Sequence, residues 1–127
     1  MKPDDAVVEN GVTIPYPSQT SNLHHENEFV VAVGKDGKDI SVDDALNHDW
    51  GYGVGIDLIR RDIKYKAKET DHPWDMVKGF DNSAPYTALR PVSDVGHPDT
   101  GNGAIWIKVN GETRQENTLN LHVWNTA

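Results

Sequence analysis

Residues 50–59 alternate glycine with larger side chains, and this pattern restricts the fold more than any other in the chain. The residues of one parity are Tyr52, Val54, Ile56 and Leu58, and those of the other are Gly51, Gly53, Gly55 and Asp57. Successive side chains of a β-strand point to opposite faces, so the pattern predicts a strand with its bulk on one face. The opposite face then carries bare backbone and one carboxylate, that of Asp57.

Other segments also favour strands joined by turns. Residues 28–34 are rich in valine and phenylalanine, which are strand formers. Asn110-Gly111 predicts a hairpin between residues 104–109 and 112–115, and Asn10-Gly11 predicts a second one between residues 7–8 and 12–14. Ser41 is positioned to cap a short helix.

Two stretches are less distinctive. Residues 60–65 are charged and fit a strand or a turn, and apolar residues alternate over residues 119–124. Together the patterns predict a mainly β fold with minor helix (α+β). We expect a single domain over residues 1–127, because no boundary between domains is visible.

Composition excludes several classes of protein. The chain has 127 residues, no cysteine and a formal net charge of -8, with 20 acidic against 12 basic side chains. This charge would repel a phosphate backbone, so we expect no nucleic-acid partner. The longest apolar runs, such as residues 29–33, are too short to cross a bilayer, so we expect no membrane partner. The lack of cysteine and of an apolar signal core at the start favours a cytoplasmic location.

Three carboxylates could form a metal site. Glu26 and Glu28 lie two positions apart, so on an extended chain they share a face at about 7 Å backbone spacing. Asp57 stands alone among glycines on the other predicted strand. Three such carboxylates would suit Mg²⁺ or Mn²⁺ and leave about three positions for water or substrate. The alternative is that both glutamates line a solvated strand edge.

Several basic residues lie near these carboxylates in the sequence. Arg61 follows Asp57 closely and could hold a substrate carboxylate, or form a surface ion pair. Lys78 lies between Trp74 and Phe80, where a partly desolvated ammonium could face developing negative charge, or could simply be a surface lysine. His24-His25 lies next to the two glutamates, and histidine is a common metal ligand and general base, but a polar loop before a strand is the favoured interpretation.

The segments HHENEFVVAVGK, GYGVGIDLIRRDIKY, PWDMVKGFDNSAP and VNGETRQ occur in this order. Together they resemble the fumarylacetoacetate hydrolase family, and KPDDAVVENGVTIPYP resembles the family's segment before the metal strand. Among the subgroups of this family, the segments LHHE and WGYGVGIDL most resemble fumarylpyruvate hydrolases. The resemblance covers nearly the whole chain and implies the family's mixed β-sandwich roll, incomplete at both ends.

The resemblance also implies roles for residues. Glu26, Glu28 and Asp57 fall on the family's metal carboxylates, Arg61 on an arginine that holds substrate, and Lys78 on a lysine that contacts it. The implied enzyme is a metal-dependent hydrolase of carbon–carbon bonds in acylpyruvates, which are 2,4-dioxo acids. Fumarylpyruvate would give fumarate and pyruvate, in aromatic catabolism. A homodimer is also implied.

Departures from the family pattern leave the activity open. Lys64 stands where the family usually has glutamine, and the family's earlier His and Glu base pair and later substrate loop have no counterpart here. The chain therefore resembles an internal piece of the family domain. Within the same family, an isomerase of hydroxy-diene-dioates or a 2-oxo acid decarboxylase would use the same residues. An inactive metal-binding fragment and a plain β domain without metal stay open as well.

Overall fold

The computed structural model describes residues 1–122 as a mixed α+β fold, which confirms the mainly β class with minor helix. The strands are β1 (Val7–Glu9), β2 (Leu23–Val33), β3 (Asp49–Arg60), β4 (Ala84–Tyr86), β5 (Arg90–Pro91), β6 (Ala104–Val109) and β7 (Glu112–Thr118). The α-helices are α1 (Val42–Ala45), α2 (Arg61–Glu69), α3 (Asp75–Lys78) and α4 (Val92–Val95). Short 3-10 turns cover Asp4–Ala6, Leu46–His48 and Leu119–Leu121. None of the helices described is long and apolar enough to cross a membrane.

The chain forms two compact units, and the long strands β2 and β3 contribute residues to both. The first unit comprises residues 1–28 and 55–88, and the second comprises residues 29–54 together with the chain from Leu89. The larger sheet has the strand order β1-β4-β3-β2, and β5 also pairs with β3. The single domain expected over residues 1–127 stays a prediction.

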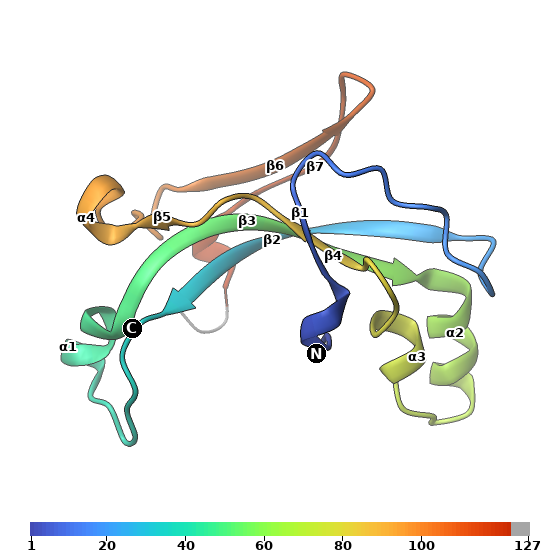
Figure 1. The fold of residues 1–127 in the computed structure, drawn as a ribbon, viewed down its shortest axis with the longest axis horizontal. Helices are drawn as coiled ribbons and strands as arrows, with labels where there is room; N and C mark the ends of the chain where they lie inside the picture. The colour runs from blue at the N-terminus through green and yellow to red at the C-terminus, as the bar shows by residue number, and fades with distance from the viewer. Residues whose placement is uncertain (123–127) are drawn as a thin grey trace. The chain divides into compact units, whose positions relative to one another are not determined.

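In the first unit, two short helices cover a small apolar core. β1 runs parallel to β4, and β4 runs antiparallel to β3 with Gly55 opposite Tyr86. Helices α2 and α3 follow β3 and lie side by side (Figure 1). Ile59, Ala67 and Val77 form the buried cluster, with Ile63 packed against it. The core therefore joins the end of β3 to both helices, which places the residues of α3 beside this strand.

In the second unit, glycine allows two strands to approach closely. Gly51 lies opposite Pro91 in the pairing of β3 with β5. A Cβ at Gly51 would come within 2.4 Å of the Arg90 carbonyl oxygen, so a side chain on this strand position would push β5 away. The close packing of β5 against β3 thus explains the glycine at position 51.

The hairpin predicted at Asn110-Gly111 is confirmed. Strands β6 and β7 pair antiparallel, with Val109 opposite Glu112. Asn110 has φ 53° and Gly111 has φ 84°, both in the left-handed region that a two-residue hairpin turn requires.

The structure corrects two local predictions. Residues 12–14 form no strand, and β1 pairs with β4 rather than across Asn10-Gly11. Residues 60–65 do not form a separate strand or turn: Arg60 ends β3 and Arg61 begins α2, because the apolar face of this helix packs on the core. Of the alternating stretch at residues 119–124, the first three residues form a 3-10 turn, and Val123 and Trp124 lie outside the described residues.

Candidate metal centre

Three carboxylates from two strands converge in the first unit. Glu26 and Glu28 lie two positions apart on β2 and therefore share a face, while Asp57 lies on β3. One carboxylate oxygen from each of the three lies within 4.8 Å of the other two. The structure therefore brings together the same three carboxylates that the spacing of the sequence singled out.

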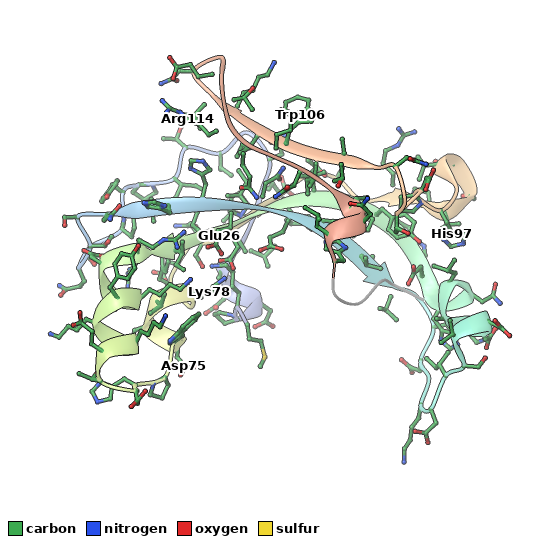
Figure 2. The ribbon with its side chains drawn as sticks, turned by 180° about the vertical axis from the view of Figure 1, so that it is seen from behind. Glu26, Asp75, Lys78, His97, Trp106 and Arg114 are labelled. Atoms are coloured by element: carbon green, nitrogen blue, oxygen red, sulfur yellow. The ribbon has the colours of Figure 1, made fainter. Side chains whose placement is uncertain are left out.

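Lys78 joins two of these carboxylates. Its Nζ donates to Glu26 Oε2 over 3.0 Å and also to Asp57 Oδ2. Figure 2 shows Glu26 on strand β2 directed toward Lys78. Lys78 is the last residue of α3, and Ser83 Oγ donates to its carbonyl oxygen over 3.0 Å. The core contact of Val77 and this hydrogen bond hold the lysine backbone beside the carboxylates.

Lys2 is a second cation in the cluster. Its Nζ lies 2.9 Å from Asp57 Oδ1 and donates to the carbonyl oxygens of Leu58 and Lys78, over 2.9 Å and 2.6 Å. The side chain is 13% exposed. Lys2 thus links the chain start to the backbone on either side of the site.

Arg61 holds the remaining oxygen of Glu26. Its Nη2 donates to Glu26 Oε1 over 3.2 Å, and its backbone N–H donates to Asn22 O over 2.9 Å. The cluster thus contains three carboxylates and three cationic side chains, all in the first unit.

The ion pairs shift the ionisation of the buried members. Burial raises the pKa of Asp57, but the nearby ammonium groups of Lys78 and Lys2 outweigh it, so the net pKa is lowered. Burial disfavours the charged form of Lys78, but its bonds to Asp57 and Glu26 leave its pKa raised. Burial lowers the pKa of Lys2, and the bond of this lysine to Asp57 only partly offsets that effect. At neutral pH, Asp57 is therefore a carboxylate and Lys78 an ammonium.

Comparison with known proteins identifies the family. The family model described as fumarylacetoacetate (FAA) hydrolase C-terminal matches residues 1–127. The chain belongs to the fumarylacetoacetate hydrolase family. A fumarylpyruvate hydrolase from Ralstonia is 36% identical over 98% of this chain and 63% of its own length. A mitochondrial oxaloacetate tautomerase from Arabidopsis thaliana is 36% identical over 91% of this chain and 51% of its own.

A solved family structure shows the same fold. The fumarylpyruvate hydrolase from Pseudomonas aeruginosa, in complex with Mn²⁺ and pyruvate, is 46% identical to this chain with a TM-score of 0.89. The match covers 98% of this chain and 55% of that protein. The chain therefore spans about half to two thirds of the length of these fumarylacetoacetate hydrolase relatives.

The donor set of this family member fits a hard divalent cation. The three converging groups are all carboxylates, the ligands that Mg²⁺ and Mn²⁺ prefer. Asp57 Oδ1 is buried and lies 2.9 Å from Lys2 Nζ. A metal ion at this oxygen would therefore take the place of an ammonium contact, one positive charge replacing another.

Sequence reasoning missed Lys2. The segment that contains it resembles the family only as the approach to the metal strand, and no spacing relates Lys2 to Asp57, 55 positions later. The parallel pairing of β1 with β4 brings the chain start to this site, and that pairing was not predicted. The only available signal was the lysine itself, directly before a proline.

Lys64, the departure from the family pattern, lies outside this cluster of charges. Its Nζ is 4.7 Å from the ring centroid of Trp74, a cation–π distance. The Trp74 ring therefore provides a contact for this extra positive charge.

Proposed function

We propose that this chain carries the metal-binding part of a hydrolase that cleaves a carbon–carbon bond in acylpyruvates. The favoured substrate is fumarylpyruvate, which with one water gives fumarate and pyruvate. The observation that carries the proposal is the convergence of Glu26, Glu28 and Asp57 within 4.8 Å, with Lys78 bonded to two of them. Two relatives named fumarylpyruvate hydrolase, one of them with Mn²⁺ and pyruvate, support it.

The three carboxylates would hold Mg²⁺ or Mn²⁺. A bound ion of this kind would supply a Lewis acid to the neighbouring oxygens of a 2,4-dioxo acid. Two glutamates on one strand and an aspartate on the next give a rigid ligand set, because β2 and β3 belong to one sheet.

Lys78 is the residue that we propose to contact the substrate and to take part in catalysis. Bond cleavage leaves negative charge on the departing pyruvate enolate, and a fixed ammonium nearby lowers the energy of that charge. The raised pKa of Lys78 keeps it protonated at neutral pH. Lys78 therefore acts as a fixed positive charge and not as a base.

Arg61 is the residue that we propose to orient a substrate carboxylate. Its guanidinium has a planar fork that suits two carboxylate oxygens, and one of its nitrogens, Nε, is buried without a hydrogen-bond partner. Nη2 meanwhile bonds Glu26. Arg61 can therefore bridge the ligand set and the substrate. We assign no water-activating base among residues 1–122.

Metal titration and turnover together test the proposal. Isothermal titration with Mg²⁺ and with Mn²⁺ is expected to give saturable heat with the native chain and none with Glu28→Ala. Glu9→Ala, an exposed glutamate on β1, is the matched control and is expected to bind as the native chain does. No heat from the native chain would favour a plain β domain without metal.

Turnover is followed by loss of the 2,4-dioxo acid absorbance of fumarylpyruvate. Metal binding without loss of absorbance would favour an inactive metal-binding fragment.

The cytoplasmic location, the place in aromatic catabolism and the homodimer remain proposals.

A tautomerase is the second candidate. The Arabidopsis thaliana relative named oxaloacetate tautomerase is as similar to the chain as the Ralstonia hydrolase, at 36% identity. Keto–enol exchange of a 2-oxo acid would draw on the same ligand set and the same fixed ammonium. Faster equilibration of freshly dissolved oxaloacetate, with fumarylpyruvate unchanged, would favour this candidate. The isomerase of hydroxy-diene-dioates and the 2-oxo acid decarboxylase would each be tested by conversion of their own substrate, with fumarylpyruvate unchanged.

A further inference from the structure

Arg60, the neighbour of Arg61, is a buried cation with few partners. It ends strand β3 with only 9% of its surface exposed. Its Cζ lies 4.3 Å from the Phe80 ring centroid, and its Nη1 donates to Met76 O over 3.3 Å. Within residues 1–122 it forms no ion pair with a carboxylate. Burying a charge without a counterion costs free energy, so we expect an anion to bind beside this arginine.

One edge of the Arg60 guanidinium lacks an acceptor. Nε is buried and has no hydrogen-bond partner, and Nη2 makes no hydrogen bond to the described part of the chain. These two nitrogens form the side edge of the guanidinium, which matches the two oxygens of a carboxylate. The geometry therefore specifies a planar, two-oxygen anion better than a single point charge.

Arg60 also lines a cavity of about 420 Å³ in the first unit. One wall is the loop of residues 15–18 and the other is the segment of residues 79–82. Tyr16, which belongs to the first wall, accepts the Leu23 N–H at its hydroxyl oxygen over 3.0 Å, which ties this wall to the start of β2. The cavity has room for a small organic acid.

None of the charged side chains of the cluster lines this cavity, although Phe80, which does, also has its ring centroid 5.3 Å from Lys2 Nζ. Asp57 and Arg60 lie three positions apart on β3, and alternation along a strand directs them to opposite faces. Arg61, by contrast, begins α2 and bonds Glu26. The side chains of these two adjacent arginines therefore have different partners.

We propose that the cavity beside Arg60 is a second binding site, specific for a small organic carboxylate. The ligand carboxylate accepts from Nη2 of Arg60 and, after a small rotation of the guanidinium that opens the buried Nε to the cavity, from Nε as well. The body of the ligand lies between the two walls. Asp81 also lines the cavity and is exposed, so its negative charge opposes the ligand and limits affinity. The inference does not depend on the proposed hydrolase activity.

Nuclear magnetic resonance of the arginine Nε–H groups tests the site directly. The full chain is titrated with sodium acetate and with sodium succinate, while sodium chloride holds the ionic strength constant. The Arg60 Nε–H signal is identified by its absence in Arg60→Lys. We expect this signal to shift saturably, with a dissociation constant on the order of 1 mM. No saturable shift up to about 100 mM carboxylate would overturn the proposal.

Three variants complete the test. Binding to Arg60→Lys is followed on the backbone N–H signals of residues 79–82, which line the cavity, and is expected to weaken about tenfold or more, because an ammonium cannot make the paired contact. Asp81→Asn changes an exposed residue and is expected to tighten binding by about threefold, since a like charge is removed. Arg114→Lys, in the second unit, is the matched control that removes a guanidinium elsewhere and should leave binding unchanged. Loss of binding with Arg114→Lys, or no gain with Asp81→Asn, would contradict the site.

Thermal unfolding of each variant shows whether it folds. If Arg60→Lys does not fold, the Nε–H signal is assigned instead through its bonds to the Arg60 backbone, and the Asp81→Asn titration then decides the question.

Discussion

Lys78 Nζ donates to Glu26 Oε2 over 3.0 Å, although the two residues lie 52 positions apart in the sequence. The same Nζ also bonds Asp57, so one ammonium bridges two candidate metal ligands from different strands. Lys78 therefore competes for the oxygens that a metal ion would use, and it stands beside the place where substrate would bind. These two effects can be separated by experiment.

Replacing Lys78 by methionine separates metal binding from turnover. Lys78→Met removes a positive charge from two ligand carboxylates, so Mg²⁺ and Mn²⁺ are expected to bind at least as tightly as to the native chain. Turnover is expected to fall about 100-fold or more, because the fixed charge facing the departing enolate is lost. Titration calorimetry measures the first effect, and loss of substrate absorbance measures the second. Weaker metal binding in this variant would show that Lys78 supports the ligand set.

Asp57 is expected to matter for both metal binding and stability. Asp57→Asn removes one ligand carboxylate, so metal affinity should fall by more than the 10- to 100-fold typical of losing an outer-shell partner. It also leaves Lys2 and Lys78 without their shared counterion. We therefore expect a loss of about 1–3 kcal/mol in the free energy of unfolding, measured by urea titration without metal.

Glu112→Gln is the control for Asp57→Asn. Glu112 is exposed and pairs with Arg114 at the surface, so its loss should cost less than about 1 kcal/mol. Equal losses for the two variants would contradict a special role for Asp57.

Asp62 gives the fold a dependence on pH. A hydrogen bond from the Thr20 hydroxyl, followed by those from the Ser21 and Ile63 N–H groups, lowers the pKa of Asp62 to about 2. The pKa is lower in the folded state than in the unfolded chain, so the folded state favours the ionised form. The stability from Asp62 is therefore fully present above pH of about 4 and is lost as the pH falls toward 2.

The Asp62→Asn variant tests this dependence. Its melting temperature is expected to be lower than that of the native chain at pH 7 and to approach it as the pH falls to about 2. Melting curves by circular dichroism at several pH values measure the difference. A difference that stays constant with pH would show that the carboxylate charge is not involved.

Ile59 connects the core to the site. It is fully buried and packs with Ala67 and Val77, and it lies two positions along β3 from Asp57. Ile59→Ala is expected to lower the free energy of unfolding by about 2–5 kcal/mol, because a cavity remains where the side chain packed. Val33→Ala is the exposed control, since Val33 is 72% exposed, and its change should stay within about 0.5 kcal/mol. Urea titration measures both, and a small effect at Ile59 would mean that the core collapses around the gap.

Local sequence predicted the features that depend on neighbouring residues. Glu26 and Glu28 share a face because strand geometry places alternate side chains together, and Asn110-Gly111 forms its turn because both residues accept positive φ. The strand at residues 49–60 follows from its own alternation. Prediction failed where contacts between distant residues decided the local structure. Helix α2 forms because it packs on a core that includes Val77, and the sequence of residues 60–65 alone does not show this contact.

The sequence by itself determined the mainly β character, the paired glutamates and the isolated aspartate, because these depend on spacing within single segments. Only the tertiary structure decided that Lys2 reaches Asp57, that Lys78 bridges two carboxylates and that adjacent Arg60 and Arg61 have different partners. These contacts depend on strand pairing and helix packing between residues far apart in the chain. No local pattern encodes them, because the energy that selects them comes from burial and charge pairing in the folded state.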